Sequence, residues 1–195
     1  MSTATTFVRP AGWSYDRRAV TFGRDIFDDA FISLEDLADP LHYRSITERL
    51  ISAQPSIAPW GAYVAPMNWA TWTATAVLLS PALVDGRVLL VDPDQLGVVV
   101  NGDPDVERFW ARPSECELRV TPTRTVRLLD ACLAPVVDAA MVVSGIGRYS
   151  LLRLIDDAIV AACEDLRGGV RGGARQRVDE FIDAICQAHH GTPLG

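Results

Sequence analysis

Arg148 and Tyr149 follow a glycine-containing break in the chain, and this position favours binding of an anionic group. Gly145 and Gly147 end one apolar helical pattern, and Arg148 opens the next. The first N–H groups of a helix have no partner within it, and an arginine beside them can hold a carboxylate or hydroxamate oxygen bidentately. Asp156 lies at the flank of the apolar stripe of the same predicted helix. We therefore predict that Arg148, Tyr149 and Asp156 bind a ligand.

A second set of candidate residues belongs to the segment from Leu50 to Val84, which contains no charged residue and no histidine. Its most regular part, from Met67 to Leu79, has tryptophan, alanine and leucine at helical spacing. Buried Asn and Thr side chains need partners from the main chain, from water or from a ligand, so this segment is predicted to form a pocket wall. The wall residues are Trp60, Tyr63, Asn68, Trp69 and Trp72, with threonines beside them.

Two polar clusters resemble metal sites only in part. Asn101, Asp103 and Asp105 alternate like the start of a calcium loop, but Val106 replaces the required glycine and Arg112 replaces the bidentate glutamate. A second cluster contains two adjacent histidines, whose side chains point apart on a helix. Its members are Asp183, Cys186, Gln187, His189 and His190. We predict no metal site.

His42 lies in the first turn of a helix predicted from Pro40 to Ala53. A positive charge is unfavourable near the N-terminus of a helix, because the N–H groups there already make that end positive. We interpret His42 as a surface or capping histidine rather than a catalytic one.

The absence of lysine excludes several cofactors and mechanisms. All 18 basic residues are arginine. A chain without lysine cannot form a Schiff base, attach pyridoxal phosphate or supply the lysine of a phosphate-binding loop. No site for a flavin or an iron–sulfur cluster is visible either, so we predict that no cofactor is bound.

Composition limits the class of protein. The chain has 195 residues, 49% of them hydrophobic, which suffices for one domain with a substantial core. A net charge of −7 argues against a nucleic-acid partner. Four cysteines without a C-x-x-C pair, after a start that is not apolar, predict a reduced, cytoplasmic protein. Prolines break the uncharged segment, so we expect no membrane span; the oligomeric state is left open.

The expected fold is α+β and predominantly α-helical, with apolar helices packed around a small antiparallel β-sheet. Ser33 and Asp36 form a capping-box pattern, and Asp39 before Pro40 is a typical helix start. Short β-branched runs between Asp-Pro and Asn-Gly turns predict the strands. The predicted single domain, residues 1–195, consists of an N-terminal arm (1–32), helices (33–84), a small sheet (85–120) and C-terminal helices (121–195).

Residues 128–164 read LLDACLAPVVDAAMVVSGIGRYSLLRLIDDAIVAACE. This pattern of two apolar helices around a Gly-Ile-Gly break, after an uncharged tryptophan-containing stretch and a β-rich region, resembles the ferric-siderophore reductase family (FhuF-like) over residues 50–194. The resemblance implies a helical ligand-binding body followed by a cysteine motif that holds a [2Fe-2S] cluster. Two features depart from it: Leu152-Arg153-Leu154 stands where the family has Trp-x-Asn, and the sequence ends at Gly195 before any cysteine motif.

These observations lead to three functional hypotheses. The first is binding or processing of a small natural product or siderophore-like molecule, on a FhuF-like scaffold without an iron–sulfur cluster. The second is a cofactor-free biosynthetic enzyme of secondary metabolism, such as a cyclase or isomerase, that acts by positioning and electrostatics. The third is a truncated ferric-siderophore reductase whose gene continues past Gly195.

Overall fold

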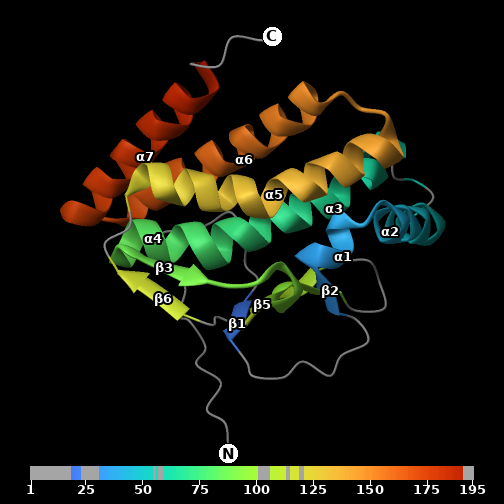
Figure 1. Cartoon of the computed structure of the whole chain (residues 1–195), viewed down its shortest axis with the longest axis horizontal. Coiled ribbons are helices and arrows are strands. Elements are labelled where there is room, and N and C mark those ends of the chain that lie inside the picture. Colours follow the sequence, from blue (N-terminus) through green and yellow to red (C-terminus); the bar gives the residue numbers. More distant parts are fainter. Residues whose placement is uncertain are drawn as a thin grey trace, which may run out of the picture.

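A computed structural model places a layer of helices over two small β-sheets (Figure 1). It describes residues 19–22, 31–54, 56, 59–100, 106–112, 115–118 and 121–190. The helices are α1 (Leu34–Ala38), α2 (Pro40–Ala53), α3 (Pro59–Ala74), the π-helix η1 (Thr75–Leu79), α4 (Ser80–Asp85), the 3-10 helix η2 (Pro93–Gln95), α5 (Pro122–Ser144), α6 (Arg148–Gly169) and α7 (Gly173–His190). The predicted α+β, predominantly helical fold class is confirmed.

The described strands form a four-stranded sheet and a separate two-stranded ribbon. The larger sheet has the order β1-β5-β4-β2, in which β5, β4 and β2 are antiparallel neighbours and β1 adds a parallel edge to β5. In the ribbon, β3 pairs antiparallel with β6. The strands are β1 (Ala19–Phe22), β2 (Phe31–Ser33), β3 (Arg87–Leu90), β4 (Leu96–Val100), β5 (Val106–Ala111) and β6 (Glu115–Leu118).

Two N-caps direct the chain from β2 into the first helices. The main-chain N–H of Asp36 donates to Ser33 Oγ over 2.9 Å, and the N–H of Ser33 donates back to the Asp36 carboxylate over 3.0 Å. This reciprocal pair is the predicted capping box, and it starts α1. Asp39 then caps α2 by accepting from the N–H of Leu41 over 2.8 Å, with Pro40 in the first turn.

Gly97 allows β4 to lie unusually close to β2. A Cβ atom at this position would lie 2.1 Å from the carbonyl oxygen of Ile32 and 2.8 Å from the Cα atom of Ser33. Gly97 pairs with Ser33 across the two strands. A residue without a side chain is therefore needed where the edge strand β2 meets the sheet.

A long helical segment formed by α3, η1 and α4 crosses the middle of the molecule (Figure 1). Pro81 has no N–H and would clash with the carbonyl of Val77 in a regular α-helix. The turn before it widens instead, so that the N–H of Ser80 donates to the carbonyl of Thr75, five residues earlier. None of the described helices is long and apolar enough to cross a membrane.

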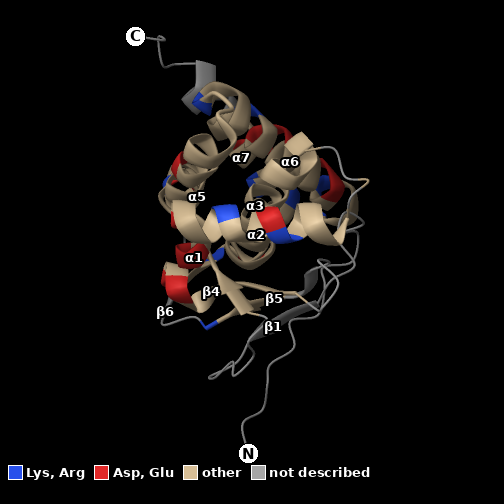
Figure 2. Cartoon of the chain, turned by 90° about the vertical axis from the view of Figure 1, so that its right-hand side faces the viewer, with Lys and Arg blue, Asp and Glu red and all other residues tan. Residues whose placement is uncertain are grey.

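Helix α3 has no charged residue and lies inside the molecule, where α2, α5, α6 and strand β4 pack against it (Figure 2). Met67, Ala70 and Ala74 on this helix are fully buried. One core cluster of buried residues extends from Ile32 in β2 to Ile185 in α7 and includes residues of every helical segment from α1 to α7 except η2. Burial on several sides accounts for the apolar composition of α3.

Candidate functional site

A pocket of about 220 Å³ lies between β2, α1, α2 and the end of β4. We call it the α2 pocket, because α2 supplies half of its residues. Its apolar lining residues are Phe31, Ile32, Ile46 and Val100, and its polar lining residues are Asp36, His42, Ser45 and Arg49. The pocket therefore offers both an apolar surface and a set of polar groups, as small-molecule sites do.

The polar residues of α2 share one side of the helix. His42, Ser45 and Arg49 recur at intervals of three and four residues, which brings their side chains onto one face. All three residues are exposed, so a molecule in solvent can reach them. Ile46, on the same face, is buried and lines the pocket below them. This spacing can be read from the sequence, whereas the placement of the strands that complete the pocket cannot.

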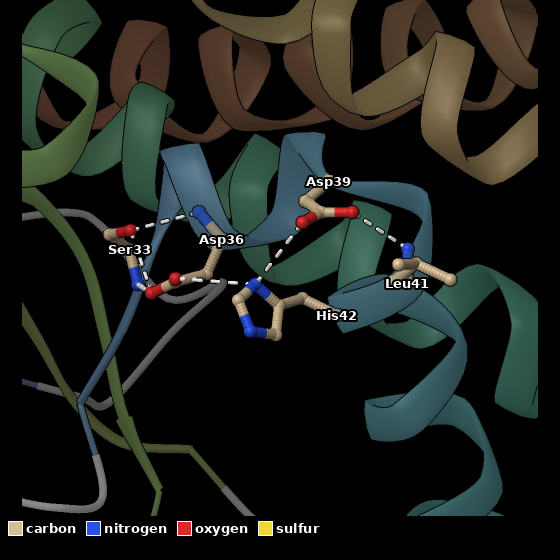
Figure 3. A network of polar contacts seen from close by, with 5 residues as sticks. All are labelled: Ser33, Asp36, Asp39, Leu41 and His42. Carbon is tan, nitrogen blue, oxygen red and sulfur yellow. Dashed lines mark hydrogen bonds and ion pairs between the residues drawn. The ribbon is translucent and has the colours of Figure 1, made fainter.

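His42 lies beside two carboxylates. Its Nδ1 atom is 3.7 Å from Asp36 Oδ1 and 3.6 Å from Asp39 Oδ2 (Figure 3). These distances exceed those of a hydrogen bond. The other ring nitrogen points away from both carboxylates (Figure 3). Nδ1 therefore faces two acceptor groups, whereas the other nitrogen does not.

The carboxylate of Asp36 is already engaged on its other side. Its Oδ2 accepts from the N–H of Ser33 over 3.0 Å and from Ser33 Oγ over 2.8 Å. The same hydrogen bonds cap α1, so the helix start and the pocket wall depend on one side chain. A substitution at Asp36 would change both at once.

The aromatic residues predicted for a pocket wall lie along α3 and do not line the α2 pocket. Trp60 is 64% exposed, whereas Trp69 is only 6% exposed and belongs to the core. Tyr63, Asn68 and Trp72 are half-buried. These five side chains thus range from exposed to buried, and their role in ligand binding stays a prediction.

The threonines of this segment bond to the main chain. The hydroxyl groups of Thr71, Thr73 and Thr75 donate to the carbonyls of Met67, Trp69 and Thr71 over 2.9, 2.7 and 2.7 Å. Each acceptor lies four residues before its donor, within the same helical segment. Of the partners that the sequence leaves open for these hydroxyl groups, the structure assigns the main chain.

Arg148 is paired with a carboxylate of its own chain. It begins α6 and donates to Asp138 near the end of α5, in an ion pair exposed to solvent. Tyr149 is 64% exposed, and Asp156 is half-buried and engaged with a neighbour. None of the three lines the α2 pocket, and their role in ligand binding stays a prediction.

Cys163 is fully buried, and burial, reinforced by the neighbouring Glu164 carboxylate, raises the pKa of its thiol to about 12. Burial also raises the pKa of the Cys132 thiol. Both therefore stay protonated, and a protonated thiol is a poor nucleophile and metal ligand.

Among the residues that the structure describes, no group of three His, Cys, Asp or Glu side chains is placed to hold a metal ion. Residues 101–105 and the side chains of residues 186–190, which make up most of the two partial metal motifs, lie outside the described part.

The α2 pocket is thus the site where apolar and charged side chains from four elements meet. Comparison of the chain with protein-family models, with curated proteins and with solved structures finds no match.

Proposed function

We propose that this protein binds a small natural product or siderophore-like molecule in the cytoplasm, on a FhuF-like scaffold without an iron–sulfur cluster. The observation that supports this proposal is the α2 pocket, whose lining combines apolar side chains such as Phe31 and Ile46 with charged ones such as Arg49. Such a lining favours an amphipathic ligand, because the apolar part is removed from water while the polar part keeps its hydrogen bonds.

The size of the pocket determines how much of the ligand it can hold. A volume of about 220 Å³ is below the range of roughly 300–1,000 Å³ that drug-sized ligands occupy. One end of a larger molecule fits this space, such as a single arm of a siderophore. The remainder would extend over the exposed face of α2.

Titration with hydroxamate and catecholate ferric siderophores, followed by tryptophan fluorescence, tests the proposal. Trp110 is a suitable reporter, since its ring lies 5.1 Å from that of Phe31, centroid to centroid, in an edge-to-face contact. We expect quenching that decreases in a Trp110→Phe variant. If none of the compounds changes the emission up to millimolar concentration, the proposal fails.

A matched pair of substitutions on α2 locates the binding site. Ser45→Phe places a large side chain in the pocket, whereas Glu48→Phe adds the same group at an exposed position of the same helix that does not line it. Binding should be lost in the first variant and retained in the second. Equal affinities in the two variants would place the site elsewhere.

A cofactor-free isomerase or cyclase is the second candidate function. It is favoured by His42, whose Nδ1 faces two carboxylates while its other nitrogen is available to take a proton from a bound molecule. A base of this kind would exchange a carbon-bound hydrogen of its substrate for deuterium in heavy water. NMR spectra of bound candidate ligands should show that exchange with the natural protein and lose it in His42→Gln.

A further inference from the structure

Two carboxylates at the His42 end of the α2 pocket, Asp36 in its lining and Asp39 beside it, are already engaged. The Asp36 carboxylate accepts from Ser33 and faces His42, and the Asp39 carboxylate accepts from the N–H of Leu41 and faces His42 as well. A ligand that donated to these carboxylates would therefore compete with the caps of α1 and α2.

Within the described part of the chain, the donor groups at the other end of the pocket are not engaged. Arg49 and Ser45 have no hydrogen-bond or ion-pair partner within the described ranges 31–54, 59–100 and 121–185. The residues three and four positions from Arg49 on α2 are Ser45, Ile46, Ser52 and Ala53, so its own helix provides no carboxylate for it. Two parallel N–H groups of a guanidinium can donate to the two oxygens of one carboxylate, and those of Arg49 can bind a ligand in this way.

Distance keeps a carboxylate at Arg49 away from the acidic end of the pocket. Arg49 lies seven residues after His42, which corresponds to about 10 Å along the helix axis. The charged group nearest to a carboxylate bound at that end is then the guanidinium group, and repulsion by Asp36 acts over a longer distance. Attraction by the adjacent guanidinium group prevails.

From this arrangement we infer that the α2 pocket recognises the carboxylate end of an amphipathic molecule. Arg49 holds the two carboxylate oxygens, Ser45 donates a further hydrogen bond, and the apolar body packs on Phe31, Ile32, Ile46 and Val100. This inference rests on the proposed function and narrows its ligand to carboxylate-bearing compounds.

Binding of benzoate and hexanoate, compared with benzamide and hexanamide, tests the inference. Each amide keeps the size and the apolar part of its acid but lacks the charge. Ligand-observed NMR should give affinities for the acids at least about tenfold higher than for the amides, because charge-assisted hydrogen bonds are the stronger kind. Equal affinities, or no binding of either acid at millimolar concentration, would overturn the inference.

Two arginines of α2 provide the matched variants. Arg49→Gln should weaken benzoate binding about tenfold or more. Arg44→Gln makes the same change in net charge at an exposed position outside the pocket and should leave the affinity unchanged. Arg49→Lys, which keeps the charge without the planar fork, should give an intermediate affinity. Equal effects of the two Gln variants would mean that only the overall charge attracts the anion, and the inference would fail.

The siderophore titration distinguishes this inference from the proposed function. Siderophore binding without benzoate binding would overturn the carboxylate inference and leave the proposed function standing. Benzoate binding that depends on Arg49, without siderophore binding, would support the inference. It would also show that the ligand is not a siderophore-like molecule.

Discussion

The hydroxyl group of Tyr43 donates a hydrogen bond of 2.6 Å to the main-chain carbonyl of Tyr63 and so connects α2 to α3. Tyr43 is fully buried, and burial raises the pKa of its hydroxyl well above its ordinary value, an effect that the nearby N–H of Met67 partly offsets. The contact lies next to Pro66, which has no N–H to donate to the carbonyl of Ala62. A side chain from α2 thus supports α3 where its own ladder of hydrogen bonds is interrupted.

Replacing Tyr43 by Phe should lower the free energy of unfolding by about 1–3 kcal/mol, because the buried carbonyl of Tyr63 loses a donor while the ring stays packed. Urea unfolding followed by circular dichroism measures this difference. Tyr149→Phe removes a hydroxyl from a residue that is 64% exposed and should have almost no effect. Equal stabilities of the two variants would show that the Tyr43 hydrogen bond contributes nothing.

Replacing Gly97 by Ala should lower stability by about 1–3 kcal/mol, because the new Cβ would overlap the carbonyl of Ile32 and push β2 from the sheet. Gly168→Ala is the control, since a Cβ there meets nothing within 4 Å. That substitution lies within α6 and should raise stability by about 0.5–1 kcal/mol through helix propensity. Thermal melting of both variants checks the opposite signs.

Arg177 connects α7 to the end of α4. Its Nε atom donates to the carbonyl of Leu83 over 2.8 Å, and a second guanidinium nitrogen donates to the carbonyl of Val84. Arg177→Ala leaves two carbonyls at a helix C-terminus without these donors and should cost about 1–3 kcal/mol. Arg175→Ala changes an exposed arginine of the same helix and should stay within about 0.5 kcal/mol of the natural protein in urea unfolding.

Stability should fall as pH rises above about 9. The pKa of Cys163 is raised from its ordinary 9.0 to about 12, so the unfolded chain releases this proton at lower pH than the folded protein does. The stabilisation is complete below pH 9.0 and is lost as pH rises toward about 12. Denaturation at pH 8, 9.5 and 11 should show a smaller decrease for Cys163→Ala. An unchanged slope would show that Cys163 has no part in the alkaline loss.

Substitutions of Trp69 and Arg148 separate packing from ligand binding. Trp69→Ala removes a core side chain and should cost about 3–5 kcal/mol, and Trp72→Ala should cost less because its ring is only half-buried. Arg148→Ala breaks an exposed ion pair with Asp138 and should cost less than about 1 kcal/mol. Its effect on benzoate affinity decides whether the start of α6 takes part in binding. We expect none if the ligand occupies the α2 pocket.

Local chemistry predicts many of the element boundaries. Asp39 before Pro40 marks the start of α2, and this helix extends from Pro40 to Ala53 as expected. The turn residues between Leu90 and Leu96 separate β3 from β4 in the same way. Such signals depend only on neighbouring residues, so they can be read without knowledge of the fold.

Pairings between distant segments cannot be read in this way. β1 and β2 are strands of only four and three residues, too short for a clear periodic pattern. β1 is recognised as a strand because it pairs with β5, with Ala19 opposite Arg108. The sequence pattern also predicts a single sheet from β3 to β6. In the structure, β3 and β6 form a separate ribbon, whereas β4 and β5 belong to the four-stranded sheet. Strand partners depend on tertiary packing, which short patterns do not record.

Sequence patterns also fail to reveal which residues come together at the candidate site. The glycines before Arg148 indicate a helix start where an anion could bind. Only the fold reveals that Arg148 forms an ion pair with Asp138 on the preceding helix. His42 was expected at the surface, and it is exposed, with a side-chain accessibility of 62%. Its position at a pocket follows from β2 and β4 lying beside α2, which its own neighbours in sequence do not indicate.

The uncharged segment that becomes α3, η1 and α4 also affects how the chain is made in the cell. Helix α5, one of the elements that cover it, begins at Pro122 and ends at Ser144, so the ribosome synthesises the apolar segment well before this part of its cover. During that interval its tryptophan and leucine side chains are open to other nascent chains and to chaperones. Refolding from denaturant should accordingly lose yield as protein concentration rises, because association through this segment competes with the docking of α5.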